Sequence, residues 1–163
     1  MSLWRHAAAV LLLPGVVTVG VPALILWRTG ASIHPLGLVG LPLIAVGLLL
    51  VVSTVRLFAT VGRGTLAPWD QTTRLVVRGP YRYVRNPMIS GVLFVLLGEA
   101  AFFGSLALQL WFGLVLAANA VYMPLVEEPG LERRFGEEYE RYRAHVPRWI
   151  PRVRPWDGEE PGR

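Results

Sequence analysis

The chain has 163 residues, 53% of them hydrophobic, and a formal net charge of +5 at neutral pH. So apolar a composition excludes an ordinary soluble domain of this length and predicts a protein that lives in a membrane. The absence of cysteine excludes disulfides and thiolate metal sites, and the scattered positions of His6, His34 and His145 form no metal-binding spacing, so we expect no bound metal.

Four apolar stretches predict membrane-spanning helices, because about 20 helical residues cross the hydrocarbon core of a bilayer. The first stretch is long for a signal peptide and no A-x-A cleavage site follows it, so we expect it to remain as a span. The third is the shortest and contains Glu99, which we interpret as a structural or interfacial acid. The four stretches are residues 7–27, 36–60, 88–104 and 106–126.

Arginine supplies all of the basic charge, and its distribution predicts the orientation of the spans. With four spans, 15 of the 16 arginines fall on one side of the membrane and only Arg28 falls on the other. The positive-inside rule makes the arginine-rich side the cytoplasm, so both termini of this multi-pass protein are expected there. Because the topology explains the basic charge, no nucleic-acid partner is expected.

Turn-forming residues divide the chain into two expected units. The sequence "RTGASIHPLG" joins the first two spans, so residues 1–60 are predicted to form a two-helix transmembrane hairpin, and residues 61–163 the second unit. This second unit begins with a polar loop, residues 61–85, whose aromatic residues argue against disorder. Asn86-Pro87 then predicts a helix start, because asparagine is a favoured cap and proline a favoured first residue.

Spans three and four are predicted to form an antiparallel hairpin, because the turn "FFGSLAL" between them is short. Glu127 and Glu128 are expected to end the fourth span. Apolar residues then recur every three or four positions in "LERRFGEEYERYRAHV", which predicts an amphipathic helix at the membrane surface or over the loop. The predicted fold class is therefore an all-α integral membrane protein with four transmembrane helices, a C-terminal amphipathic helix and a cytoplasmic loop.

This topology brings the loop, the start of span three and the two glutamates together at the cytoplasmic interface. A helix N-terminus attracts a carboxylate or phosphate, whereas Glu127 and Glu128 attract an ammonium group or ribose hydroxyls. Tyr81 and Tyr83 are able to face a sulfonium or to stack on adenine. S-adenosylmethionine carries all of these groups, and the alternative interpretation is that the arginines and glutamates are plain anchors at the membrane interface.

Residues 72–151 resemble a known family. The motif "GPYRYVRNPM", then "EEP" after one helical hairpin, then "FGEEYERYRAHVPRWIP" are similar to motifs of the membrane methyltransferases that include isoprenylcysteine carboxyl methyltransferase and phosphatidylethanolamine N-methyltransferase. The resemblance implies an enzyme of class EC 2.1.1 with S-adenosylmethionine as its cofactor. It also implies that residues 61–163 are the methyltransferase core and that their loop binds the cofactor.

The resemblance further implies which residues contact the cofactor. In the carboxyl methyltransferase branch, contacts come from the four residues before a G-x-Y turn, from the tyrosine of that turn, from an R-H-P-x-Y motif and from an acidic residue after the hairpin. The matching residues here are Thr73, Arg74, Leu75, Val76, Tyr81, Asn86, Pro87, Met88, Ile89 and Glu127.

Two departures from that branch bear on the methyl acceptor. Asn86 replaces the histidine of R-H-P, and the R-N-P-M form resembles the phospholipid branch instead. Met123 stands where the carboxyl methyltransferases place an arginine that resembles a clamp for the substrate carboxylate, and a thioether cannot pair with a carboxylate. The resemblance therefore implies transfer to a lipid amine or another small lipophilic acceptor. A carboxyl or thiol acceptor, or a non-catalytic membrane bundle, are the alternatives.

Methyl transfer from a sulfonium is an in-line displacement, so the protein chiefly aligns the acceptor and excludes water. A neutral amine acceptor still loses a proton, and Glu128 is the nearest candidate base, with a solvated acid at the helix end as the other interpretation. Asn119 and Met123 precede Glu127 at four-residue intervals and are predicted to line the acceptor pocket. We expect the acceptor to enter sideways from the bilayer and the cofactor to arrive from the cytoplasm, beneath the loop as a lid.

Overall fold

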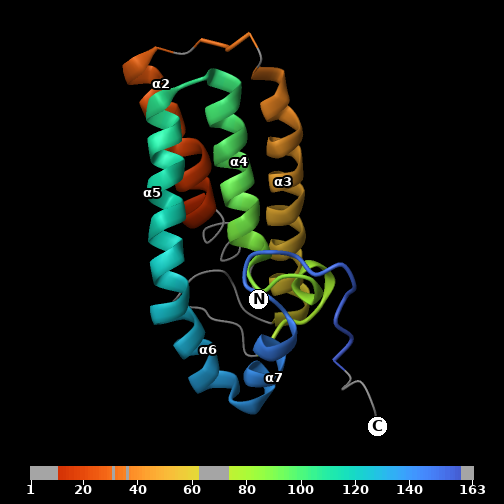
Figure 1. Cartoon of the computed structure of the whole chain (residues 1–163). Helices are drawn as coiled ribbons and strands as arrows, with labels where there is room; N and C mark the ends of the chain where they lie inside the picture. The colour runs from red at the N-terminus through yellow and green to blue at the C-terminus, as the bar shows by residue number, and fades with distance from the viewer. Residues whose placement is uncertain (1–10, 31, 36, 63–73, 159–163) are drawn as a thin grey trace.

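Long apolar runs form a bundle of helices in the computed structural model of the chain (Figure 1). The structure describes residues 11–30, 32–35, 37–62 and 74–158, and within these ranges it contains helices and no strand, which confirms the all-α prediction for them. The elements are η1 (Leu11–Gly20), α2 (Val21–Thr29), η2 (Gly37–Val39), α3 (Gly40–Leu57), η3 (Phe58–Gly62), η4 (Gly79–Arg82), α4 (Pro87–Phe103), α5 (Leu106–Tyr122), η5 (Met123–Glu127), α6 (Glu128–Phe135) and α7 (Glu137–His145).

Two continuous helices of the described chain are long and apolar enough to cross a membrane, namely Gly37–Val61 and Leu106–Phe135. Two shorter apolar helices, Pro14–Thr29 and Pro87–Phe103, lie beside them. Large apolar side chains point outward from the long helices: Leu49 of α3 is 71% exposed and Leu110 of α5 is 67% exposed. Such a surface suits contact with hydrocarbon chains better than contact with water.

Facing glycines hold α3 and α4 close together. A Cβ atom added to Gly47 would lie 2.6 Å from the carbonyl oxygen of Gly91, and one added to Gly98 would lie 2.7 Å from the carbonyl oxygen of Gly40. These distances are too short for any side chain, so the two backbones touch where the glycines meet. Close approach at small residues is the usual way for helices to pack inside a bilayer, where the hydrophobic effect does not drive association.

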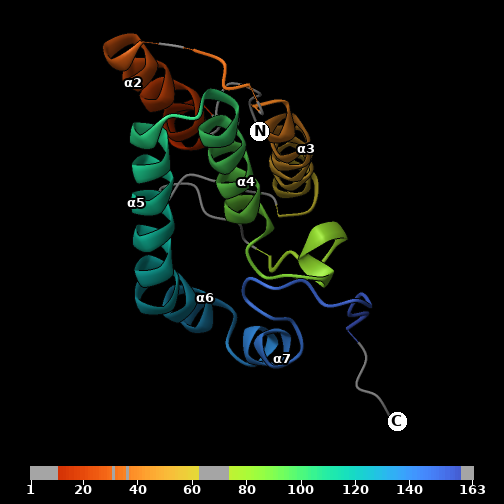
Figure 2. The same cartoon turned by 45° about the horizontal axis from the view of Figure 1, so that its top comes forward.

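The first helix packs on the opposite side of α4 from α3. The indole Nε1–H of Trp111, on α5, donates a hydrogen bond to the carbonyl oxygen of Val17 over 3.1 Å, and both residues pack against the buried cluster of Val92, Leu96 and Val115. Figure 2 shows α4 between α2 and α3. The first two helices are therefore separated by α4, where the sequence predicted a hairpin.

Local sequence explains the ends of α4. Pro87 occupies the first turn, as predicted, and its fixed φ angle favours this position. Gly104 ends the helix with φ of +58°, a left-handed conformation that glycine adopts at no steric cost. The hydroxyl of Ser105 then accepts a hydrogen bond from the N–H of Leu108 and caps α5. α4 and α5 thus form the antiparallel pair expected from their short connection.

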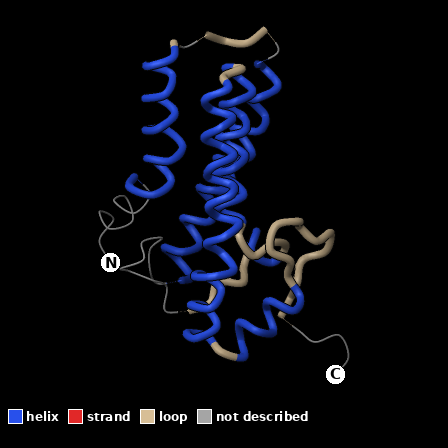
Figure 3. Tube along the Cα trace, turned by 60° about the vertical axis from the view of Figure 1, so that its left-hand side comes forward, coloured by secondary structure: helices blue, strands red, loops and turns tan. Residues whose placement is uncertain are grey.

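The last part of the chain differs from the prediction in two ways. The fourth helix does not end at Glu127 and Glu128, because it continues through η5 into α6 as far as Phe135. The expected amphipathic helix is two helices, since Gly136 has φ of +51° and breaks it. Figure 3 shows these short helices and the neighbouring loops below the long helices.

The apolar face predicted for that amphipathic helix is buried against the loop. Tyr139, Tyr142 and Val146 are at most 2% exposed, and Leu75 and Val77 of the loop pack against them. Of the two places predicted for this segment, the structure therefore has the one over the loop.

Candidate functional site

Tyr81 lies at the centre of the loop end of the bundle. Its ring stacks on that of Phe58 with centroids 5.7 Å apart, and its carbonyl oxygen accepts a 2.7 Å hydrogen bond from the hydroxyl of Tyr142. Burial raises the pKa of Tyr81 well above its usual range, and the neighbouring Tyr142 and Glu127 raise it further. Two predicted cofactor residues, Tyr81 and Glu127, are therefore close enough to interact, and the Tyr81 hydroxyl stays protonated.

Alkaline solution is expected to destabilise this end of the protein. Burial also raises the pKa of Tyr142, so Tyr81 and Tyr142 keep their protons in the folded state, whereas both ionise near pH 10 in the unfolded state. The unfolded state then binds fewer protons, so stability is intact below about pH 10 and falls above it by about 1.4 kcal/mol per pH unit for each tyrosine. Denaturant titrations between pH 9 and 11 check this, and Tyr142→Phe, which leaves the raised pKa values of Tyr81 and Tyr139 in place, is expected to reduce the slope. An equal slope in wild type and variant would contradict the assignment.

The π-helical turn η5 changes which residues share a face of the fourth helix. The backbone N–H of Met123 donates to the carbonyl oxygen of Asn119, four residues earlier, but the N–H of Glu128 donates to the carbonyl oxygen of Met123, five residues earlier. The turn thus takes up one extra residue. Met123 and Glu128 are both 6% exposed, while Glu127 is half-buried. The face predicted as Asn119, Met123 and Glu127 is therefore continued by Glu128.

Glu128 is held by two arginines from different parts of the chain. The guanidinium of Arg148 donates to both carboxylate oxygens, over 2.7 and 2.8 Å, and Nη1 of Arg85 lies 3.2 Å from Oε1. The hydrogen bonds to Glu128 raise the pKa of Arg148, which stays charged. Arg85 also donates to the hydroxyl of Tyr139 over 3.3 Å. The interpretation of Glu128 as a solvated acid is wrong, and its role as a general base stays a prediction.

Two buried donors at the start of α4 have no partner in the described part of the chain. They are Nε of Arg85 and Nδ2 of Asn86, on adjacent residues. Asn86 was predicted to cap α4, but its side chain accepts no capping hydrogen bond. A buried donor without a partner costs free energy, so each one calls for an acceptor.

The remaining predicted residues are distributed around this end of the bundle. Val76 is 5% exposed and Arg74 is exposed, while Thr73 lies outside the described residues. Pro87 is buried, and Met88 and Ile89 are half-buried in the first turn of α4. The side chain of Asn119 donates to the carbonyl oxygen of Val115 in its own helix, over 2.8 Å.

The chain's last described segment, residues 147–158, lies along residues 82–85 at the end of the loop. The N–H of Arg85 donates to the carbonyl oxygen of Pro147, and the N–H of Arg152 donates to that of Tyr83. Arg82 and Trp156 form two further bonds, one of them from Nε of Arg82 over 2.6 Å. We call residues 147–158 the tail. It fixes the loop from outside.

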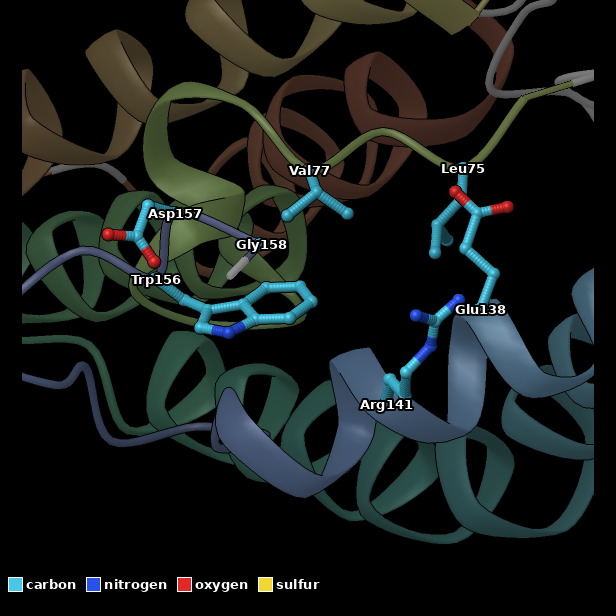
Figure 4. Close-up of a pocket in the computed structure, with 7 residues that line it drawn as sticks. All are labelled: Leu75, Val77, Glu138, Arg141, Trp156, Asp157 and Gly158. Carbon is cyan, nitrogen blue, oxygen red and sulfur yellow. The ribbon is translucent and has the colours of Figure 1, made fainter. Parts of the chain in front are cut away.

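A cavity of about 270 Å³ lies between the loop, α7 and the tail (Figure 4). Leu75 and Val77 form one wall, Glu138 and Arg141 another, and residues 156–158 the third. Leu75 is the predicted cofactor residue among those that line it. Trp156, which lines the cavity, contacts buried Tyr142, and the hydroxyl of Tyr142 donates a hydrogen bond to the carbonyl oxygen of Tyr81.

Sequence reasoning missed Arg85, Arg148 and Tyr139, which surround Glu128. Arg85 and Arg148 stand inside the quoted motifs "RNPM" and "VPRWIP", so motif membership was the available signal. No spacing pattern connects them, because Arg148 meets Glu128 from 20 residues away in the chain.

Comparison with known proteins gives three findings. The model of the phospholipid methyltransferase family matches residues 36–138. A protein-S-isoprenylcysteine O-methyltransferase of Schizosaccharomyces pombe is 38% identical over 79 residues, which are 48% of this chain and 34% of that protein. The match thus spans about a third of the length of this relative. No solved structure matches the chain.

Proposed function

Because the chain belongs to the phospholipid methyltransferase family of membrane methyltransferases, we propose that it uses S-adenosylmethionine to methylate a lipid amine or another small lipophilic acceptor. One observation carries the proposal. The buried donors Arg85 Nε and Asn86 Nδ2 lie at the start of α4, and Arg85 joins them directly to the carboxylate of Glu128. Donors beside carboxylates suit a ligand that carries both a carboxylate and an ammonium group.

The proposed cofactor site combines hydrogen-bond donors, an acidic residue, a tyrosine and apolar residues. The first-turn N–H groups of α4 and the amide of Asn86 would hold the carboxylate of the methionine part. Half-buried Glu127 would hold its ammonium group. Tyr81, neutral and buried, would contribute its ring and hydroxyl beside Glu127. Val76, Pro87, Met88 and Ile89 supply apolar surface that excludes water from the site.

The chemistry asks little of the protein. When bound, S-adenosylmethionine would supply an activated methyl group, with S-adenosylhomocysteine as the leaving group. The residues around it orient the acceptor for in-line attack and keep water out. An amine acceptor would attack in its neutral form, and the methylated ammonium product would then release one proton to water. Both oxygens of Glu128 already accept hydrogen bonds from Arg148, so a proton transfer to Glu128 would first break that pair.

A carboxyl acceptor is the second candidate, favoured by the similarity to an isoprenylcysteine O-methyltransferase. Met123 argues for the first, because it is buried where the carboxyl branch carries an arginine. A buried thioether offers no positive charge to an anionic acceptor. We therefore place an uncharged or amine-bearing lipid beside Met123 and Asn119.

The proposed topology has four spans with both termini in the cytoplasm. Two described helices meet the length requirement, and the 17-residue helix α4 rises about 25 Å, near the lower limit for a span. The loop end of the bundle would then face the cytoplasm and admit the cofactor, while the acceptor enters from the bilayer. We infer that α3 belongs to the methyltransferase core with residues 61–163, since the family match begins at residue 36.

An Asn86→Leu variant is expected to lose affinity for the carboxylate of the cofactor. Removing a hydrogen bond to a charged group costs about 1.5–3 kcal/mol, so S-adenosylhomocysteine is expected to bind at least tenfold more weakly. The affinities of wild type and Asn86→Leu for the decarboxylated analogue of S-adenosylhomocysteine are expected to agree within twofold. Isothermal titration calorimetry in detergent measures all four affinities. Gln109→Leu, an amide removed from an exposed position on α5, is the control. Equal losses for both ligands would place the carboxylate elsewhere.

The proposed activity is tested by incubating the purified protein with S-adenosylmethionine labelled in its methyl group and with total membrane lipid. Label is expected in amine-bearing lipids and absent from base-labile methyl esters. Label in the esters would make the carboxyl acceptor the correct one. If the protein neither bound S-adenosylhomocysteine nor transferred label to any fraction, it would be a non-catalytic bundle of this family.

A further inference from the structure

The ion pairs around Glu128 join two of the segments that the proposed cofactor site requires, which are those that carry Asn86 and Glu127. Glu128 follows Glu127 directly, and Arg85 precedes Asn86 directly. Nη1 of Arg85 lies 3.2 Å from Glu128 Oε1, so the start of α4 and the start of α6 meet at this carboxylate. Arg148, from the tail, closes the cluster with two hydrogen bonds.

The contact geometry of Arg148 fixes the position of the Glu128 carboxylate. A guanidinium that donates to both oxygens of one carboxylate sets its plane and its distance, which a single contact does not. Glu128 is 6% exposed and its side chain has lost its solvent, so this orientation is maintained by the protein alone. The pair forms directly after an irregular part of the helix, because Glu128 is the first residue after the π-helical turn. Such single π turns inside α-helices are rare and frequently lie at functional sites.

We propose that Arg148 is a positioning residue for methyl transfer: its two-point contact with Glu128 sets Glu127 and Asn86 at the separation that the cofactor needs. This inference rests on the proposed function, because the cofactor defines the separation that matters. It assigns to Glu128 the task of joining the two segments. It also makes the tail part of the site, although the tail supplies no predicted cofactor contact.

Loss of Arg148 is expected to leave the fold intact. Glu128 still faces Arg85 in an Arg148→Ala variant, so no charge is left buried alone, and the Arg148 side chain is already one-third exposed. The backbone bonds of the tail to Tyr83 and Arg85 do not involve the lost side chain. The Arg148→Ala variant is therefore expected to fold, which makes it suited to a test of positioning.

The test compares Arg148→Ala with Arg143→Ala. Arg143 pairs with Glu132 over 3.3 Å, also joins the C-terminal helices and is exposed, so it is a matched control. Arg148→Ala is expected to bind S-adenosylhomocysteine at least tenfold more weakly and Arg143→Ala within twofold. Millimolar methylguanidinium is expected to restore most of the affinity of Arg148→Ala, and Arg148→Lys to lie between wild type and alanine. Unchanged affinity in Arg148→Ala would overturn the inference and leave the proposed function standing.

A second measurement needs no cofactor. The chain has no cysteine, so spin labels attach only at introduced cysteines, here Tyr83→Cys in the loop and Arg133→Cys in α6. The distance distribution between the labels is expected to broaden in Arg148→Ala and to stay narrow in Arg143→Ala. An equally narrow distribution in Arg148→Ala would overturn the positioning role. If wild type failed to bind the cofactor, the proposed function and its cofactor geometry would fall, and this distance would still report on the role of Arg148 in the fold.

Discussion

A Gly47→Ala substitution is expected to destabilise the bundle by about 3 kcal/mol. The added methyl group would lie 2.6 Å from the carbonyl oxygen of Gly91 and 2.8 Å from the N atom of Val95, both backbone atoms that no rotamer change removes. The two helices would have to separate, and their contacts along the whole interface would weaken. Thermal unfolding in detergent, followed by circular dichroism, measures the loss.

Gly113→Ala provides the control for this prediction. Gly113 lies on α5, and a Cβ atom there meets no other atom within 4 Å. The same change is expected to be neutral or to stabilise by up to about 1 kcal/mol, because alanine favours a helix more than glycine does. Gly91→Ala added to Gly47→Ala is expected to cost less than it does alone, since the helices have already moved apart. Similar melting temperatures for Gly47→Ala and Gly113→Ala would show that the helices do not touch at Gly47.

A Glu128→Gln substitution is expected to cost about 3 kcal/mol of stability. The amide keeps the shape of the side chain but removes its charge, so the guanidinium groups of Arg85 and Arg148 remain side by side with no carboxylate between them. Arg85 is the more affected, because its side chain is only 10% exposed. Denaturant titration at neutral pH measures the change.

The matched substitution is Glu132→Gln, which removes a carboxylate from the exposed pair with Arg143. Exposed pairs contribute about 0–1 kcal/mol, so this variant is expected to remain close to wild type. Glu128→Gln and Glu132→Gln make the same chemical change, so the difference between their stabilities measures the effect of burial on the ion pair. A cost for Glu128→Gln no greater than that for Glu132→Gln would mean that the carboxylate of Glu128 is surrounded by water.

Local signals in the sequence were sufficient for the elements that depend on neighbouring residues. Asn86-Pro87 marked the start of α4, and the glycine and serine at positions 104 and 105 marked the turn into α5. Each of these depends on φ angles within a few residues, and the start of α5 depends also on the capping bond of Ser105. The apolar positions of the C-terminal segment were also recognisable from their spacing, because the same periodicity that predicts a helix predicts its buried face.

The sequence was less informative where distant segments meet. The π turn has one local trace, Pro124, whose missing N–H disturbs the hydrogen bonds of the fourth helix. A regular α-helix without the π turn has four-residue spacing, and that spacing predicted Glu127 rather than Glu128 on the buried face. The bonds between Arg82 and Trp156 join residues 74 positions apart, and such pairing leaves no periodic pattern. The same is true of the glycine contacts between α3 and α4, which depend on how two helices face each other.

The tail is synthesised after the loop that it contacts. A ribosome delivers the chain from its N-terminus, so the helices up to α5 enter the membrane before Arg148 and Trp156 exist. The loop has by then been made, but its backbone partners in the tail have not. A chain that ends before the tail would therefore leave the N–H of Arg85 and the carbonyl oxygens of Arg82 and Tyr83 without the backbone partners that hold this part of the loop.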